Sequence, residues 1–284
     1  MEEKGFIIET DSGEREAHIG DLRVMADAGN PTGVYGLGMA LLFGWDTEPN
    51  PAKGYALIRK ACEAGNVDAM TLLLKMFFSG EYTDMTPEQA AKYAEKASAA
   101  GIPDAQLYYG TAYMDGIGVP KDPVKAVSLF RAAADQGSGE AENSLAYMYL
   151  NGQGVGKDVH RALGLFRKAA SHECVNALFQ TGFCYETGIG CRIDWKKAEK
   201  WYLKSLESGD SFAADRLGRM YAAGGNGITA DPKKAFEYTV RAASDGITES
   251  MQTASEFYRT GFGTDSDLTE ADKWAALAKS NRQN

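Results

Sequence analysis

Two cysteines, Cys184 and Cys191, are the residues of this sequence whose type and spacing come closest to a chemical site. They lie seven residues apart, and two thiols so placed could form a redox pair or contribute to a metal site. The alternative is that both fill a hydrophobic core, since an unpaired buried cysteine packs as a small apolar side chain. No histidine lies at ligand spacing from them. We interpret both as core residues and predict no metal site and no cofactor.

Three histidines and one glycine-rich segment are the other candidates for chemistry. His18, His160 and His172 are scattered along the chain, and surface or capping roles account for them, although catalytic partners can meet from distant positions. The segment 152–157 superficially resembles a phosphate loop, but Asn151 stands where the first glycine of Gly-x-x-x-x-Gly-Lys is required. The sequence has no His-Glu-x-x-His and no Ser-x-x-Lys motif. We therefore predict no catalytic residue.

Composition excludes several classes of function. The 284 residues carry a net charge of −9, with a sequence pI of about 5.0, so the chain lacks the concentrated basic surface that nucleic acid requires. It has no stretch of about 20 apolar residues, and residues 1–15 lack the apolar segment of a signal peptide. Four cysteines fit a reducing compartment. We expect a cytoplasmic protein that binds no nucleic acid and does not insert into membranes.

A repeat of about 36 residues organises the sequence. Glycines recur after Ala-rich segments at steps of 36 residues, with one step of 37, and Glu173 replaces one of them: Gly29, Gly65, Gly101, Gly137, Gly209 and Gly246. The extra residue lies in the segment 224–227. An alanine column keeps the same register: Ala90, Ala126, Ala162, Ala198, Ala235 and Ala271. Several columns in one register indicate a repeat protein.

The pattern within each repeat predicts two helices. In the third repeat the first helix covers about 102–115 and ends at Gly116, which can adopt the left-handed conformation. The second helix begins after a residue with a good N-cap side chain, and proline follows in four repeats. These N-cap residues are Asn50, Thr86, Asp122, Asp158, Asp194, Asp231 and Asp267. Small residues let neighbouring helices approach closely, and aromatic residues of the second helices fill the space between them.

This register divides the chain into an N-terminal tail (1–13), a capping helix (14–29) and seven repeats. The capping helix would cover the core face that a solenoid otherwise exposes at its end. The repeats are predicted at 30–65, 66–101, 102–137, 138–173, 174–209, 210–246 and 247–284.

The recurring pattern Ala-x-x-x-Leu-Gly-x-x-Tyr-x-x-Gly-x-Gly-Val-x-x-Asp-x-x-Lys-Ala resembles the Sel1-like repeat, a relative of the tetratricopeptide repeat. It is clearest at 105–137 and 141–170, whereas the first two repeats depart from it in the loops 45–49 and 81–85. The resemblance implies an all-α fold, a right-handed α-solenoid or α/α superhelix of helix-turn-helix repeats. It also implies a bacterial-type adaptor that holds protein partners in a concave groove.

Other branches of the family resemblance carry different implications. Some relatives link successive helices by disulfides, and Cys62 matches the first cysteine of such a pair, but Met70 stands in the place of its partner. The sequence therefore disfavours this secreted branch. Other relatives are linked to β-lactams, and this branch implies a small-molecule-binding or hydrolytic function.

The candidate binding residues lie on one face of the first helices, at positions whose residue type varies from repeat to repeat. A set of equivalent positions in the repeats is called a column. The scaffold does not require the candidate residues, and by analogy with tetratricopeptide solenoids they line the concave wall. We predict a groove for a protein or peptide at Tyr35, Met39, Lys75, Phe78, Leu107, Met114, Asn143, Tyr147, Phe179, Phe183, Glu186, Asp215 and Arg219. Its expected anchor is the cluster Tyr147, Phe179 and Phe183, with Arg219 beside it. The alternative is that curvature buries some of these residues between first helices.

An acidic row accompanies the same face. It consists of Asp68, Asp104, Glu140 and Glu249. These residues could face the groove, but they also lie in the first helical turn, where a carboxylate complements the helix dipole. The sequence does not separate the two interpretations.

The predicted function is a non-catalytic protein–protein interaction scaffold that binds a partner segment in its groove. The alternative is a small-molecule-binding or hydrolytic enzyme, β-lactam-related by family resemblance, that uses the groove as its cleft. A buried, hydrogen-bonded pair of titratable groups in the groove would favour the enzyme.

We expect all four thiols to be free in the native protein, because no pair of cysteines matches a disulfide framework. Alkylation of the unfolded protein without reductant, followed by mass spectrometry, should give four modified cysteines. A crosslink between Cys184 and Cys191 would contradict both this prediction and the cytoplasmic assignment.

Overall fold

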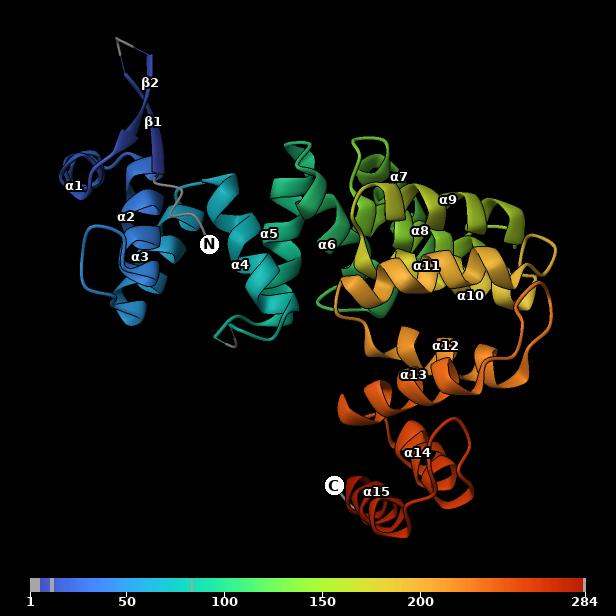
Figure 1. Cartoon of the computed structure of the whole chain (residues 1–284). Coiled ribbons are helices and arrows are strands. Elements are labelled where there is room, and N and C mark those ends of the chain that lie inside the picture. Colours follow the sequence, from blue (N-terminus) through green and yellow to red (C-terminus); the bar gives the residue numbers. More distant parts are fainter. Residues whose placement is uncertain (1–5, 11–12, 83, 283–284) are drawn as a thin grey trace. The chain divides into compact units, whose positions relative to one another are not determined.

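The computed structural model describes residues 6–10, 13–82 and 84–282. Within these ranges fifteen α-helices follow one another, and the two strands form a single hairpin near the N-terminus (Figure 1). The predicted all-α fold of helix pairs is confirmed. The chain divides into two compact units, residues 1–133 and 134–284. In every repeat the earlier helix is called the first helix and the later one the second helix.

The first unit contains the hairpin, the short helix α1 (Ile19–Asp27) and the first three repeats. Its first helices are α2 (Pro31–Phe43), α4 (Val67–Phe78) and α6 (Pro103–Asp115). Its second helices are α3 (Pro51–Glu63), α5 (Pro87–Ala99) and α7 (Pro123–Ala134), the last of which ends at the unit boundary. From α1 to α6 each helix packs against the next one in the chain.

The second unit contains four repeats. Its first helices are α8 (Gly139–Asn151), α10 (Val175–Thr187), α12 (Ser211–Ala223) and α14 (Thr248–Thr260). Its second helices are α9 (Val159–Ser171), α11 (Trp195–Glu207), α13 (Pro232–Ser244) and α15 (Leu268–Asn281). Each helix from α8 to α15 packs against its successor, so α9, α11 and α13 each contact two first helices.

The N-terminal segment differs from the predicted tail and capping helix. Strand β1 (Phe6–Thr10) pairs antiparallel with β2 (Gly13–Ala17), in a register that places Phe6 opposite Ala17. The helix α1 begins only at Ile19, so the prediction of a helix from residue 14 is wrong for 14–17. The physical reason is local. Residues 6–10 include Ile7, Ile8 and Thr10, which are β-branched residue types that favour a strand. Residues 13–17 therefore pair with this strand and do not form the predicted helix. The remainder of the predicted tail, residues 1–5 and 11–12, lies outside the described residues.

The predicted starts of the second helices are confirmed at every repeat. Each N-cap side chain accepts a hydrogen bond from a backbone N–H of the first helical turn, which satisfies a donor that the helix itself leaves unpaired. The seven acceptors are Asn50, Thr86, Asp122, Asp158, Asp194, Asp231 and Asp267. The predicted left-handed end of α6 is also present, since Gly116 has a φ of 79°.

Close approach of small and aromatic residues forms the core between paired helices. Phe130, Phe166 and Tyr202 of the second helices are completely buried. A Cβ added at Gly110 would lie 2.6 Å from the ring of Phe130, and one added at Gly182 would lie 2.8 Å from the ring of Tyr202. In these two repeats the glycine of the first helix is therefore the place where an aromatic ring of the second helix packs.

Glu173 occupies a backbone position that suits glycine. In five of the other six repeats the equivalent residue is a glycine with positive φ, for example 89° at Gly137 and 91° at Gly209; the seventh repeat holds Arg282 there. Glu173 takes the same left-handed conformation, with a φ of 62°. A side chain with a Cβ is disfavoured there by sterics, so this repeat pays a conformational cost that the others avoid.

Replacing this residue by glycine, Glu173→Gly, should raise the stability of the protein by about 1 kcal/mol, because the left-handed strain is removed. The matched change is Gly137→Ala, which should lower stability by a similar amount, since no atom lies within 4 Å of the added Cβ and only the backbone is affected. The midpoint of urea unfolding measures both. An unchanged or lowered midpoint for Glu173→Gly would contradict this account of the strain.

Candidate functional site

All thirteen residues predicted to line a groove lie on first helices, and none of them is fully buried. Lys75 and Arg219 are exposed, and the other eleven are half-buried. Six of the thirteen belong to the first unit and seven to the second.

In the first unit the predicted residues also take part in packing. The ring of Phe78 stacks on Tyr108 at a centroid distance of 5.2 Å, and Tyr35 packs edge-on against Phe6 at 5.8 Å. Tyr35, Met39 and Phe78 all pack against the core of this unit. Burial raises the pKa of Tyr35 to about 12, with smaller contributions from the charges of Asp68 and Cys62. These positions combine a scaffold role with partial exposure.

In the second unit the predicted aromatic cluster is formed by neighbouring side chains. Phe179 and Phe183, one turn apart on α10, have parallel rings with centroids 6.5 Å apart. Phe179 also contacts the buried ring of Tyr202, at 5.3 Å. Tyr147 rests on Phe166 and lines, together with Asn143 and Phe179, a hollow of about 610 Å³ between α8, α10 and the start of α12. One side of the cluster is therefore packed and the other faces an open hollow.

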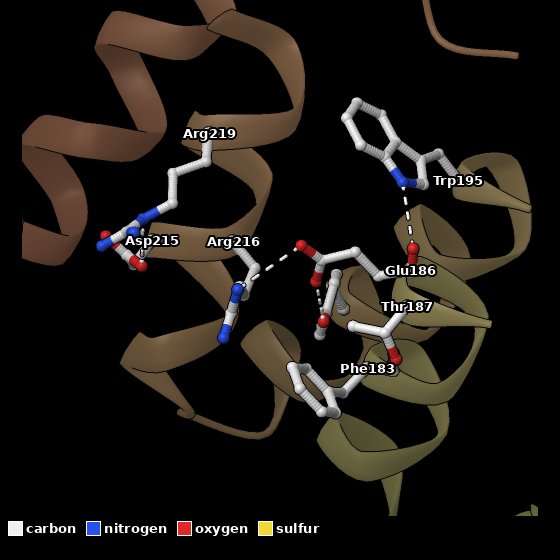
Figure 2. A network of polar contacts seen from close by, with 8 residues as sticks. Phe183, Glu186, Thr187, Trp195, Asp215, Arg216 and Arg219 are labelled. Atoms are coloured by element: carbon white, nitrogen blue, oxygen red, sulfur yellow. Dashed lines mark hydrogen bonds and ion pairs between the residues drawn. The ribbon is translucent and has the colours of Figure 1, made fainter. Parts of the chain in front are cut away.

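The arginine beside Phe183 is Arg216, not Arg219. The guanidinium of Arg216 lies 5.1 Å from the centre of the Phe183 ring, a cation–π contact. Arg219 instead forms an ion pair with Asp215 at 2.8 Å, one turn earlier on α12. Figure 2 shows these two arrangements side by side. Arg216 was missed because its position in the repeat is equivalent to none of the thirteen residues from which the groove was predicted.

Glu186 joins this cluster to the core. Its carboxylate accepts a hydrogen bond from the Tyr202 hydroxyl at 2.5 Å and pairs with Arg216 at 3.4 Å. Trp195 donates its indole N–H to the backbone carbonyl of Glu186, at 3.3 Å (Figure 2). Burial, and then the hydrogen bond to Glu186, hold the pKa of Tyr202 far above its usual value. The hydroxyl therefore remains a proton donor that orients the carboxylate.

The three histidines have separate structural partners. His18 Nδ1 lies 3.3 Å from the Asp46 carboxylate, and His160 Nδ1 lies 2.9 Å from the Gly190 carbonyl oxygen. His172 lies 2.9 Å from Glu142, a completely buried carboxylate that also pairs with Lys168 at 2.7 Å. Sequence reasoning missed Glu142, because its column is apolar in most other repeats, for example Val34, Met70 and Leu178. Glu142 therefore joins α8 to Lys168 of α9 and to His172, which directly follows α9.

The four cysteines are all unpaired in the structure. Cys184 is buried, as predicted, and burial raises its pKa to about 12. Cys191 is half-buried, and its thiol lies 3.5 Å from the Cys184 carbonyl oxygen. Burial also raises the pKa of Cys191. Thiols so protonated are weak nucleophiles and weak metal ligands. In the described ranges no group of three or more His, Cys, Asp or Glu side chains is placed to hold a metal ion.

The hydrogen bond between Tyr202 and Glu186 should contribute about 1.5–3 kcal/mol, since its acceptor is charged and largely buried. Tyr202→Phe should therefore lower the midpoint of urea unfolding, whereas the ring itself fits because Phe130 and Phe166 hold the same column. The control is Tyr238→Phe, which removes a hydroxyl that has no hydrogen-bond partner among the described residues. Equal midpoints for the two variants would show that the hydroxyl of Tyr202 adds nothing.

Comparison with known proteins agrees with this architecture. The family model described as Sel1 repeat matches residues 31–66, 76–102, 103–138, 139–173, 175–210 and 211–247. These matches fall within one residue of the predicted repeat bounds, except that the second begins at 76. Residues 248–284 are outside the matches, and there α14 and α15 form a further packed helix pair. None of the described helices is long and apolar enough to cross a membrane.

Two solved structures resemble the chain over most of its length. One is a protective antigen present in uropathogenic Escherichia coli strains that displays an SLR fold, with 26% identity over 93% of this chain and a TM-score of 0.83. The chain spans only 56% of that protein. The other is a Sel1 repeat protein from Oxalobacter formigenes, with 26% identity, a TM-score of 0.74, and 92% and 76% of the two chains covered. No curated protein matches the chain in sequence. Because the family model covers well over half of it, and because both structures share its fold, the chain belongs to the Sel1 repeat family.

Proposed function

We propose that the chain is a non-catalytic scaffold that binds an extended or helical segment of a protein partner across the first helices of its second unit. The proposed surface, called the α8–α12 face, consists of Asn143, Tyr147, Phe179, Phe183, Glu186, Asp215, Arg216 and Arg219. The observation that carries the proposal is the half-exposed stack of Phe179 and Phe183. Sel1 repeat proteins are in general scaffolds for protein–protein interaction, which supports it.

The scaffold does not require phenylalanine at these two positions. The column of Phe179 holds Thr71, Asn143 and Asp215 in other repeats, and the column of Phe183 holds Lys75, Thr111 and Glu256. The fold therefore accepts polar residues at both of these positions. Two adjacent, partly exposed aromatic rings that the fold does not need are best explained by burial against a partner.

The surroundings of the stack have the anatomy of a protein interface. The apolar centre, Phe179 and Phe183, is bordered by Arg216 and Glu186 on one side and by Asn143 on the other. Charged groups at the border are already paired within the chain, so a partner would not have to leave them unpaired when it covers them. Arginine and aromatic side chains are also the types that contribute most to interface energies.

The enzyme alternative has weaker chemical support. Glu186 and Tyr202 are a buried, hydrogen-bonded titratable pair beside the α8–α12 face, which is the arrangement expected of an enzyme. However, a general acid or base works best with a pKa near the working pH. The pKa of Tyr202 is instead raised above its usual value, which moves it further from neutral pH. The pair therefore suits an orienting role, and the favoured assignment is a protein that is not an enzyme.

Three further parts of the prediction stay proposals. The groove residues of the first unit, Tyr35, Met39, Lys75, Phe78, Leu107 and Met114, are proposed to extend the binding function. The partner is proposed to be a protein or peptide, with no nucleic acid and no membrane insertion involved. A cytoplasmic location is proposed, and four unpaired cysteines support a reducing compartment.

The double variant Phe179→Ala/Phe183→Ala should weaken a partner captured by affinity purification with the full chain by about 2–4 kcal/mol, or roughly 30- to 800-fold in Kd. The reason is the loss of the buried aromatic area at the centre of the interface. Titration calorimetry with the purified partner measures the change.

The matched control is Leu268→Ala/Leu277→Ala, which removes two exposed apolar side chains of α15, away from the α8–α12 face. It should bind like the parent. The proposal fails if the phenylalanine variant binds equally well. It also fails if that variant melts far below the parent, because the stack would then be core.

A further inference from the structure

Phe212 is an exposed aromatic residue in a column that is otherwise polar. It lies in the first turn of α12 and is 65% exposed. The six other repeats hold Thr32, Asp68, Asp104, Glu140, Asn176 and Glu249 at this position. The repeat architecture therefore has no need for a phenylalanine there, and its exposure to water is unfavourable unless a ligand covers it.

Two hollows of different character meet at Phe212. The apolar hollow, of about 610 Å³, is also lined by Tyr147, Val175 and Phe179, and Val175 is itself 41% exposed. The acidic hollow, of about 510 Å³, lies on the other side of Phe212 and contains Asp210, Asp245 and Glu249. The surface thus presents an apolar recess directly beside three carboxylates.

Among the residues that the structure describes, no cationic side chain balances these carboxylates. The described residues that line the two hollows include no lysine, arginine or histidine. Asp210 accepts hydrogen bonds from Ser205 and from the backbone of Phe212, and Asp245 accepts one from Ser211. Within the described residues none of the three carboxylates forms an ion pair with a basic side chain. A bound cation would therefore supply the charge that is missing here.

The helices of the second unit differ in charge according to their place in the repeat. The first helices, α8, α10, α12 and α14, contain six acidic and three basic residues. All three of those basic residues are arginines already paired with acids, Arg216 with Glu186, Arg219 with Asp215 and Arg259 with Asp272. The second helices contain twelve basic and five acidic residues. The field at the first helices therefore favours a basic partner segment over an acidic one.

Resting on the proposed function, we infer that the surface around Phe212 recognises a partner segment in which a bulky apolar side chain lies within two residues of a lysine or arginine. The apolar side chain fills the hollow beside Tyr147 and Phe179. The cation lies beside Asp245 and Glu249, where it also contacts the exposed ring of Phe212. Because Phe212 lines both hollows, the two side chains of the ligand must lie close together in its sequence. In an extended segment successive residues rise about 3.3 Å, so a separation of one or two residues spans the ring.

The test uses a displayed library of random 12-residue peptides selected on the full chain at low salt. Selected peptides are then synthesised, and their Kd values are measured by fluorescence anisotropy. We expect the enriched sequences to contain an aromatic or large aliphatic residue with lysine or arginine within two positions. Replacing that basic residue by glutamine should weaken binding about fivefold or more, and the loss should shrink as salt is added, since salt screens exposed charges.

Variants of the chain locate the binding. The double variant Asp245→Asn/Glu249→Gln should weaken binding of the selected peptides about fivefold or more, and the Kd should then depend less on salt. The control Glu207→Gln/Glu237→Gln neutralises two exposed acids of second helices, with the same change in net charge, and should have no effect. Phe212→Ala should weaken binding at least tenfold, whereas Leu268→Ala, at a residue with a similar exposure of 60%, should not.

The outcomes separate this inference from the proposed function. Enriched peptides without a basic residue that still depend on Phe179 and Phe183 would overturn the inference and leave the scaffold function in place. Basic peptides that bind the Asp245→Asn/Glu249→Gln and Phe212→Ala variants as well as the parent would overturn it too, since binding would then lie elsewhere. Selection of no peptide also overturns it, and the scaffold function is then decided by the captured partner alone.

Discussion

The close packing of a first helix against the following second helix, at a glycine of the first helix in four repeats, is the contact on which the rest of the structure depends. At Gly110 and Gly182 an added Cβ would come within 2.6 and 2.8 Å of an aromatic ring. At Gly218 it would come within 2.6 Å of the Thr239 hydroxyl. Since helices can approach this closely only where a side chain is small, the first-helix column holds small residues in six of the seven repeats, and Leu74 is its one large member. Residues at positions that face away from this contact do not take part in it, so their types can differ between repeats.

Contacts between successive repeats are set by backbone as well as by side chains. In three loops the second glycine presses on the start of the preceding second helix, where an added Cβ would lie 2.0–2.3 Å from a carbonyl oxygen: Gly118 on Pro87, Gly190 on Val159 and Gly263 on Pro232. The sixth repeat, with its extra residue, replaces this contact by a hydrogen bond from the Trp195 N–H to the Asn226 carbonyl oxygen at 3.3 Å. An insertion is tolerated there because the loop gains a different anchor on the same helix.

The repeat register and the helix starts could be predicted because each depends on residues close together in the sequence. The N-cap of α7, for instance, requires only Asp122 and the two backbone amides that follow it. The hairpin was missed because a search for helical repeats gives no weight to β-branched residues before the first repeat. Arg216 was missed for another reason, since a column predicts which face a residue lies on but not which partner its long side chain chooses. Phe212 did carry a signal, because it is the one aromatic residue in the column of the acidic row, but only the acidic members of that column were considered as a possible surface.

The fifth repeat shows that core and surface columns are not independent. Phe166 and Leu150 hold two equivalent positions in the fourth repeat, and both are apolar. In the fifth repeat the same positions hold Tyr202 and Glu186, and the added hydroxyl donates to the added carboxylate. Glu186 then pairs with Arg216, which covers Phe183. A buried glutamate without that donor would be costly, and a buried hydroxyl without that acceptor would be unsatisfied. Tyr202 and Glu186 therefore depend on each other. Because Glu186 also holds Arg216, a tyrosine in the core helps to place the arginine that lies over the exposed ring of Phe183.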